Sequence, residues 1–149
     1  METELETEIT QKVQAFTEQD WRELEDLYQR IINHAGSFSE MGGVQEIEPG
    51  VIEMPYTIEK PIVIEARRFF LSKHLIVPFV WSKWEEGKAM FRVSEEERFK
   101  NTSLPDVIKL FIAVMRNDRF VDGAWADLFE NGDGQRLFKR LLDFKPTSL

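Results

Sequence analysis

The sequence predicts a mainly α fold at the margin of α+β: a compact helical domain of five or six helices with one small β-hairpin. Apolar residues recur at helical spacing through most of the chain, and capping residues precede several of these stretches. One short β-prone stretch has Pro49-Gly50 at its centre. Because 149 residues suit one ordinary domain, we expect residues 1–149 to form a single globular unit with residues 1–4 frayed.

The first 36 residues predict two helices. Apolar residues recur every three or four positions over residues 5–16, which is the spacing of one helical face. Thr17 followed by Asp20 is typical of a capping pair, so a second helix is expected to begin there. Gly36 is expected to end it.

The hairpin is predicted after a loop over residues 36–43, which are rich in Gly and Ser. Its two strands are expected at Val44–Glu48 and Val51–Met54. Pro49-Gly50 joins them as a type II turn, since Pro fixes the first turn angle and Gly accepts the positive φ that follows.

A third helix is expected from Ile58 to His74, with Pro61 in its first turn, where the missing N–H costs nothing. Residues 75–80 then predict a connector or a short strand. Residues 81–84 predict one helical turn that closes at Gly87.

The last third predicts a buried central helix. Ser94 with Glu97 indicates a short acidic turn, and Ser103 with Asp106 opens the most apolar helix, which Asn117 or Asp118 ends. Apolar residues lie on nearly every side of it, as in a helix that is buried all round. Two further helices are expected over residues 119–130 and 134–144.

Composition limits the protein class. The chain lacks Cys, so it offers no disulfide and no thiolate metal ligand, and no apolar run approaches the roughly 18 residues of a membrane span. The start of the chain does not resemble a signal peptide. We therefore expect a cytoplasmic protein that does not enter membranes.

Charge is distributed unevenly. The net charge is −8, but residues 1–60 carry fourteen Asp and Glu against four Lys and Arg, a net −10, whereas residues 61–149 carry thirteen against fifteen, a net +2. Repulsion from phosphate argues against a general nucleic-acid binder. The alternative is a local basic face that contacts nucleic acid, formed by Arg67, Arg68, Lys73, Arg136, Lys139 and Arg140.

Motifs for catalysis, metal ions and cofactors are missing. The chain has two histidines, His34 and His74, each near an expected helix end, where a structural role is the more common one. There is no HExxH motif, no nucleophile elbow and no phosphate-binding glycine loop. We therefore assign no catalytic residue and expect no metal ion or cofactor.

The strongest candidate for a binding site follows the apolar helix. Arg116 and Arg119 lie on one side of a helical turn, and Asp118 and Asp122 lie on another. Two guanidiniums could hold a carboxylate or phosphate by paired hydrogen bonds, and we expect at least one of them at the wall of the largest groove. The alternative is a charged knot that ties one helix to the next.

Trp81 and Trp84 form a second candidate. Lying three positions apart, they could stack on a ligand or meet a partner protein. The alternative is that they pin a connector to the core, which is the more frequent role of Trp at this spacing.

The chain resembles an uncharacterised bacterial family of small proteins, a domain of unknown function with W-x-x-W and R-x-D-R-F-x-x-G landmarks. The resemblance covers about residues 50–140. In this sequence the landmarks are Met54-Pro55-Tyr56, Phe79-Val80-Trp81-Ser82-Lys83-Trp84 with Gly87, and Arg116-Asn117-Asp118-Arg119-Phe120-Val121-Asp122-Gly123. Relatives have a carboxylate immediately before the first Trp, where this chain has Val80. The resemblance therefore implies no catalytic role at that position and no reaction.

Three functions are compatible with the sequence. We favour a non-catalytic module that binds a protein or a small anionic ligand, with homodimerisation as one form of that binding. A hydrolase or transferase acting through scattered Asp, Glu and Arg residues is the first alternative. An accessory protein that contacts nucleic acid is the second.

Overall fold

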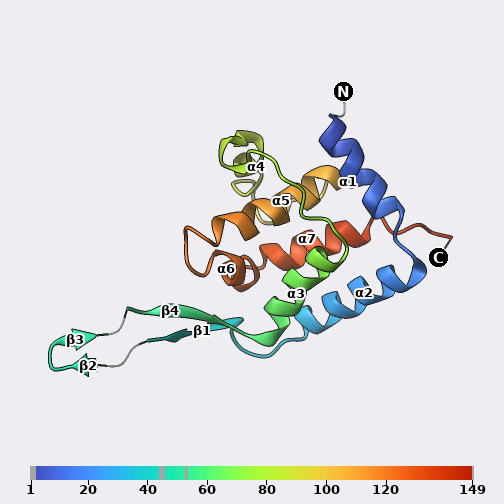
Figure 1. Ribbon diagram of the computed structural model, residues 1–149. Helices are drawn as coiled ribbons and strands as arrows, with labels where there is room; N and C mark the ends of the chain where they lie inside the picture. The colour runs from blue at the N-terminus through green and yellow to red at the C-terminus, as the bar shows by residue number, and fades with distance from the viewer. Residues whose placement is uncertain (1–2, 44–45, 53, 149) are drawn as a thin grey trace.

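The computed structural model describes residues 3–43, 46–52 and 54–148 as a helical body from which a β-hairpin projects (Figure 1). The described residues form seven α-helices, one 3-10 turn and four short strands. This confirms a mainly α fold with a small hairpin. In chain order the elements are α1 Glu4–Gln14, α2 Glu18–Ile32, β1 Ser39–Gly42, β2 Glu46–Glu48, β3 Val51–Ile52, β4 Tyr56–Glu59, α3 Pro61–Ser72, η1 Trp81–Lys83, α4 Glu85–Met90, α5 Leu104–Asn117, α6 Ala124–Glu130 and α7 Asp133–Leu142.

Side-chain caps fix the starts of three helices. The Thr17 hydroxyl accepts a hydrogen bond from the Asp20 N–H at 3.1 Å, and the Asp20 carboxylate accepts one from the Thr17 N–H at 2.9 Å. This reciprocal pair is the capping box that the sequence predicts for α2. Ser103 caps α5 in the same manner, as expected. Thr3 caps α1, and its side chain accepts a hydrogen bond from the Glu6 N–H.

Helix α5 is the centre of the body. It contacts α1, α4, α6 and α7, and its residues from Leu104 to Ile112 include seven buried side chains. The Phe111 ring is fully buried, with centroid distances of 4.4 Å to Phe70 and 5.1 Å to Phe138. The apolar character of α5 on all sides therefore predicted its central place correctly.

The hairpin is longer than expected. At its tip, β2 pairs with β3 around Pro49-Gly50, and Gly50 has the positive φ of 83° that the turn requires. At its base, β1 pairs antiparallel with β4, with Ser39 opposite Glu59 and Gly42 opposite Tyr56. Of the strands predicted at 44–48 and 51–54, residues 44, 45 and 53 lie outside the described residues.

Strands β1 and β4 correct two sequence predictions. Residues 39–42 were expected to be loop, and residues 58–59 were expected to begin a helix. Helix α3 begins instead at Pro61, because a residue before proline is held in an extended conformation, and Lys60 has φ −71° and ψ 153°. The extended chain before Pro61 then pairs with residues 39–42.

Two further boundaries differ from the prediction. Gly87 does not close a turn but lies inside α4, a helix that was not expected, where it contacts the Trp84 ring; a Cβ at this position would lie 2.2 Å from Trp84 Cε3. Helix α6 begins at Ala124 rather than at residue 119, because Gly123 adopts a left-handed φ of 89°. Within the described part of the chain, no helix is long and apolar enough to cross a membrane.

Candidate binding site

The segment 116–123 lies where four elements meet: the end of α5, the start of α6, the base of the hairpin and α3. Its two carboxylates have backbone partners. Asp118 Oδ1 accepts a hydrogen bond from the Trp125 N–H at 3.0 Å, which satisfies one of the free N–H groups at the start of α6. Asp122 Oδ2 accepts one from the Thr57 N–H at 2.7 Å and so fastens β4 to the body.

Arg67, from the middle of α3, is the cation that approaches Asp118. Its guanidinium forms an ion pair with Glu59 on β4 and lies 4.0 Å from Asp118 Oδ2. Its central carbon lies 5.8 Å from the centroid of the Trp125 ring, within range of a cation–π contact. The cation that links the helices at this junction is therefore Arg67, whose place beside the segment no short-range sequence signal could show.

Arg116 and Arg119 lie together at the rim of a hollow of about 240 Å³, which we call the arginine hollow. Among the described residues, neither guanidinium has a hydrogen bond or an ion pair to another side chain. Three of the side chains that line it, those of Leu71, Ile76 and Met115, are apolar. The lining residues are Arg67, Leu71, Ile76, Met115, Arg116, Asp118 and Arg119.

The arginine hollow is not the largest groove, contrary to the expectation for these arginines. A hollow of about 340 Å³ lies between α2 and α3, where Arg30 is paired with both Asp26 and Glu65. Because these carboxylates already compensate Arg30, the larger hollow offers less positive charge to a ligand. The larger hollow is therefore not the one with more uncompensated positive charge.

Trp81 and Trp84 line a separate, more apolar groove of about 190 Å³ on the other side of α5. The Trp84 ring is half-buried, and the Lys109 ammonium lies 4.3 Å from its centroid. The Trp81 ring has its centroid 6.1 Å from that of Phe120. The end of α5 thus separates the arginine hollow, which Arg116 lines, from the tryptophan groove, which Asn117 lines.

Apolar side chains are exposed at the turn between the two hollows. Phe120 is 77% exposed, and Val80 and Val121 are also exposed. Phe120 and Val121 follow Arg119 directly, so the rim of the arginine hollow continues into an apolar surface. Neighbouring exposed apolar side chains are common where proteins meet partners.

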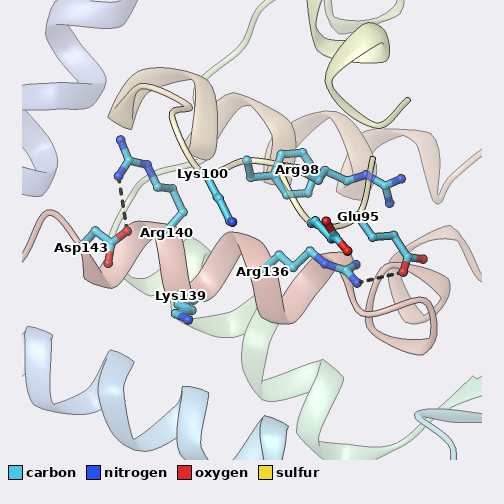
Figure 2. A pocket seen from close by; sticks show the side chains of 9 residues that line it. Glu95, Arg98, Lys100, Arg136, Lys139, Arg140 and Asp143 are labelled. Carbon is cyan, nitrogen blue, oxygen red and sulfur yellow. Dashed lines mark hydrogen bonds and ion pairs between the residues drawn. The ribbon is translucent and has the colours of Figure 1, made fainter. Parts of the chain in front are cut away.

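A second cluster of cations lies between α7 and the turns before α5 (Figure 2). Arg98 and Lys100 face Arg136 and Arg140 across a hollow of about 190 Å³. Arg98 and Lys100 lie far from α7 in the sequence and were not predicted to join it. The carboxylate of Asp133, which is 3% exposed, lies 2.9 Å from Arg98 and 2.8 Å from Arg136.

Carboxylates compensate most of this second cluster. Arg136 also approaches Glu95 at 3.8 Å, and Arg140 approaches Asp143 at 3.3 Å (Figure 2). Buried Asp133 between two arginines is the arrangement of a structural ion-pair network. These pairs leave little free positive charge to attract an anion.

The six residues of the possible nucleic-acid face lie at two places in the chain. Arg136, Lys139 and Arg140 lie on α7 and line the second cluster, whereas Arg67 and Arg68 lie on α3 and Lys73 follows it directly. Two of the α3 cations are paired: Arg67 with Glu59, and Lys73 with Asp20 and Glu23.

Neither histidine lines a described hollow. His34 forms a hydrogen bond through Nε2 with the Ser37 carbonyl at 2.9 Å and stacks on Phe38. His74 adopts a positive φ of 57° directly after α3, and its carbonyl accepts a hydrogen bond from Lys12. Among the described residues, no group of three His, Asp or Glu side chains is placed to hold a metal ion.

Comparison with known proteins gives one match. Residues 16–147 match the profile of a family described as "Family of unknown function (DUF6508)". The match includes both tryptophans and the whole segment 116–123. Neither the curated proteins nor the solved structures contain a match to the chain.

Proposed function

We propose that this chain, which belongs to the family of unknown function DUF6508, is a non-catalytic binding module whose arginine hollow binds an anionic group. The observation that carries the proposal is the pair Arg116 and Arg119 at the rim of one hollow. Among the described residues, the only carboxylate of that hollow is Asp118, which is engaged by Arg67 and by the start of α6. The charge of the pair is thus available to a ligand.

The chemistry of the hollow indicates a carboxylate or a phosphate attached to an apolar stem. Arginine presents a planar fork of N–H donors that matches the oxygens of either anion. The apolar side chains of Leu71, Ile76 and Met115 can accommodate the stem. Burial of each methylene group there stabilises the complex by about 0.8 kcal/mol.

The size of the hollow favours a small ligand. Sites for drug-sized molecules and cofactors measure about 300–1,000 Å³. The arginine hollow, at about 240 Å³, is smaller and suits a single acidic side chain or a small organic anion. A protein segment that inserts one acidic residue therefore fits the proposal as well as a free metabolite does.

The composition of the hollow supports binding over hydrolysis or group transfer. Such a reaction would need a nucleophile or a general base within reach of the bound group. Asp118, which would have to serve, is held by a backbone N–H at 3.0 Å. Its other oxygen lies 4.0 Å from the Arg67 guanidinium, so both oxygens face structural partners.

Melting curves with and without inorganic phosphate test the proposal, using the wild type, Arg119→Lys and Arg92→Lys. Arg92 is an exposed arginine outside the hollow and serves as the matched control. At a phosphate concentration 100-fold above Kd, binding stabilises the native state by about 2.7 kcal/mol. We expect this stabilisation in the wild type and in the control at low protein concentration, where copies of the chain are separate, and a weaker one in Arg119→Lys, because lysine lacks the planar fork.

Two results would contradict the proposal. If Arg119→Lys lowers the melting temperature without phosphate, and phosphate stabilises no variant, then Arg119 has a structural role. If neither phosphate nor the substitution changes melting, the segment is ordinary surface. A short peptide with a single glutamate, titrated by calorimetry, gives an independent measure of the same site.

A further inference from the structure

We propose that the natural occupant of the arginine hollow is the acidic hairpin of a second copy of this chain. In such a pair the hairpin tip of each copy binds the arginine hollow of the other. This inference rests on the proposed function, because it names the partner of that same hollow. It follows from the charge of the hairpin, from the direction in which it projects, and from the apolar surfaces at both places.

The hairpin is a purely acidic segment. Between Arg30 and Lys60 the sequence contains no Lys or Arg and five Glu residues. Two of these, Glu40 and Glu59, lie at the base and pair with Lys60 and Arg67. Glu48, near the tip, is exposed, and among the described residues it has no ion pair. The charge of the tip therefore faces solvent and is opposite in sign to that of the arginine hollow.

The hairpin projects away from the helical body, so its tip does not reach the hollow of its own chain (Figure 1). Its base is fixed beside that hollow, because Asp122 binds the Thr57 N–H. Val51 lies six positions before Thr57 in the sequence, so at about 3.3 Å per extended residue the tip can lie up to roughly 20 Å from this anchor. An acidic tip that reaches an arginine hollow must therefore belong to another copy.

This placement suits a two-fold pair. Each copy carries a hollow beside the base of its hairpin and a carboxylate at the tip. Two hairpins lying side by side in opposite directions would bring each tip to the hollow of the other copy. Such an isologous arrangement uses the same surface on both copies and closes as a dimer.

Apolar side chains are available on both sides of such an interface. On the hairpin, Met54 is 84% exposed, and Met41 and Tyr56 are exposed as well. Around the hollow, Phe120 and Leu71 are exposed. Protein interfaces combine a buried apolar centre rich in aromatic residues and Met with charged groups that fix the register.

Charge exchange between the two surfaces tests the inference. Sedimentation equilibrium of the full chain should show a dimer for the wild type. Glu48→Arg alone and Arg119→Glu alone should each weaken association by about tenfold or more, because each places like charges opposite one another in both contacts. Mixing the two variants in equal amounts should restore the dimer, since both contacts of the mixed pair again join opposite charges.

The control is Glu86→Arg, which makes the same charge change at an exposed position on α4 and should leave association unchanged. A monomeric wild type would overturn the inference. So would a dimer that Arg119→Glu leaves intact, which is the result expected if hairpins pair edge to edge. Phosphate binding is then measured on Glu48→Arg, in which no acidic tip occupies the hollow: binding by this variant would leave the proposed function standing whatever the oligomeric state of the wild type, whereas no binding would argue against the function itself.

Discussion

The Asp20 carboxylate stabilises the fold through two contacts made by its two oxygens. One oxygen accepts a hydrogen bond from the Thr17 N–H at 2.9 Å and closes the capping box of α2. The other accepts one from the Lys73 ammonium at 2.7 Å, across the gap to the end of α3. The Lys73 hydrogen bond, followed by that of the Thr17 backbone, lowers the pKa of Asp20 below its ordinary value.

This lowered pKa predicts how Asp20→Asn changes stability with pH. A carboxyl whose pKa is lowered in the folded state stabilises the protein above the unfolded pKa of about 3.9, and the stabilisation is lost as the pH falls through the folded value. We expect Asp20→Asn to lower the free energy of unfolding by about 1 kcal/mol at pH 7. The difference from the wild type should disappear at the acid end of a series of urea titrations.

Asp106→Asn is the matched control, because burial raises the pKa of Asp106. An acid whose pKa is raised destabilises the folded state once it ionises, so its effect has the opposite sign. Asp106→Asn should leave the stability at pH 7 unchanged or increase it. Equal losses for both variants would show that the hydrogen bonds of Asp20 do not contribute as described.

Single residues also show which contacts a sequence can predict. The capping box at Thr17 and Asp20 could be predicted because its partners lie three positions apart. The partner of Asp118 could not, because Arg67 is brought to it by the packing of α3 against α6. Sequence spacing placed Arg116 and Arg119 on the side away from Asp118 and Asp122, but Asp118 lines the arginine hollow together with both arginines, and Asp122 does not.

At the scale of elements, Gly123 joins α5, α6 and the hairpin and accepts no side chain. Its φ of 89° is left-handed, and a Cβ there would lie 2.8 Å from Thr57 Oγ1. We expect Gly123→Ala to destabilise the protein by at least about 1–2 kcal/mol, the cost of the left-handed conformation alone. Chemical denaturation measures the loss.

Gly50→Ala separates the cost of a left-handed backbone from the cost of the contact between a Cβ and Thr57. Gly50 has a similar φ of 83°, but nothing lies within 4 Å of the place its Cβ would take. Gly123→Ala should therefore cost more than Gly50→Ala, and Thr57→Ala should recover part of the excess in a double-mutant cycle. Equal costs at both glycines would mean that the contact with Thr57 has no energetic effect.

Helices were easier to predict than the base of the hairpin, for a physical reason. A helix makes its hydrogen bonds within itself, so caps and apolar spacing near Ser103 were enough to predict α5. Strand β1 has the sequence Ser-Glu-Met-Gly, which has little β-propensity, and it is a strand only because β4 lies beside it. The partner strand, whose paired residues lie up to twenty positions away, decides its structure.

At the scale of the whole molecule, Phe111 joins the helices into one core. Its ring lies within 4.4–6.2 Å of rings on α3, α6 and α7, measured between centroids. We expect Phe111→Ala to lower the free energy of unfolding by about 3–5 kcal/mol. Because such domains are stable by about 5–15 kcal/mol, this is a large share of the total.

The same experiment tests whether the body is one folding unit. If it is, tryptophan fluorescence and far-UV circular dichroism should report a single shared transition in both Phe111→Ala and the wild type. The matched control is Phe120→Ala at low protein concentration, which should change stability by less than about 0.5 kcal/mol because this ring is 77% exposed. Two separate transitions would divide the chain into independent units.

The distribution of charge over the whole molecule explains why the candidate site could be predicted only in part. The sequence showed an acidic first part and a slightly basic second part. It could not show that the acidic hairpin extends away from the body, or that Arg98 approaches Asp133 beside Arg136. Both facts depend on how residues far apart in the chain are arranged in space.

The hairpin without Lys or Arg has a practical consequence for proteolysis. Trypsin cleaves after Lys and Arg but not before proline, so Lys60 before Pro61 is protected as well. The whole hairpin therefore stays within one tryptic fragment, residues 31–67, however far it extends into solvent. A glutamate-specific protease, in contrast, finds Glu46 exposed near the tip, whereas Glu48 stands before Pro49 and is protected. Digestion by the two enzymes in parallel would report on the body and on the hairpin separately.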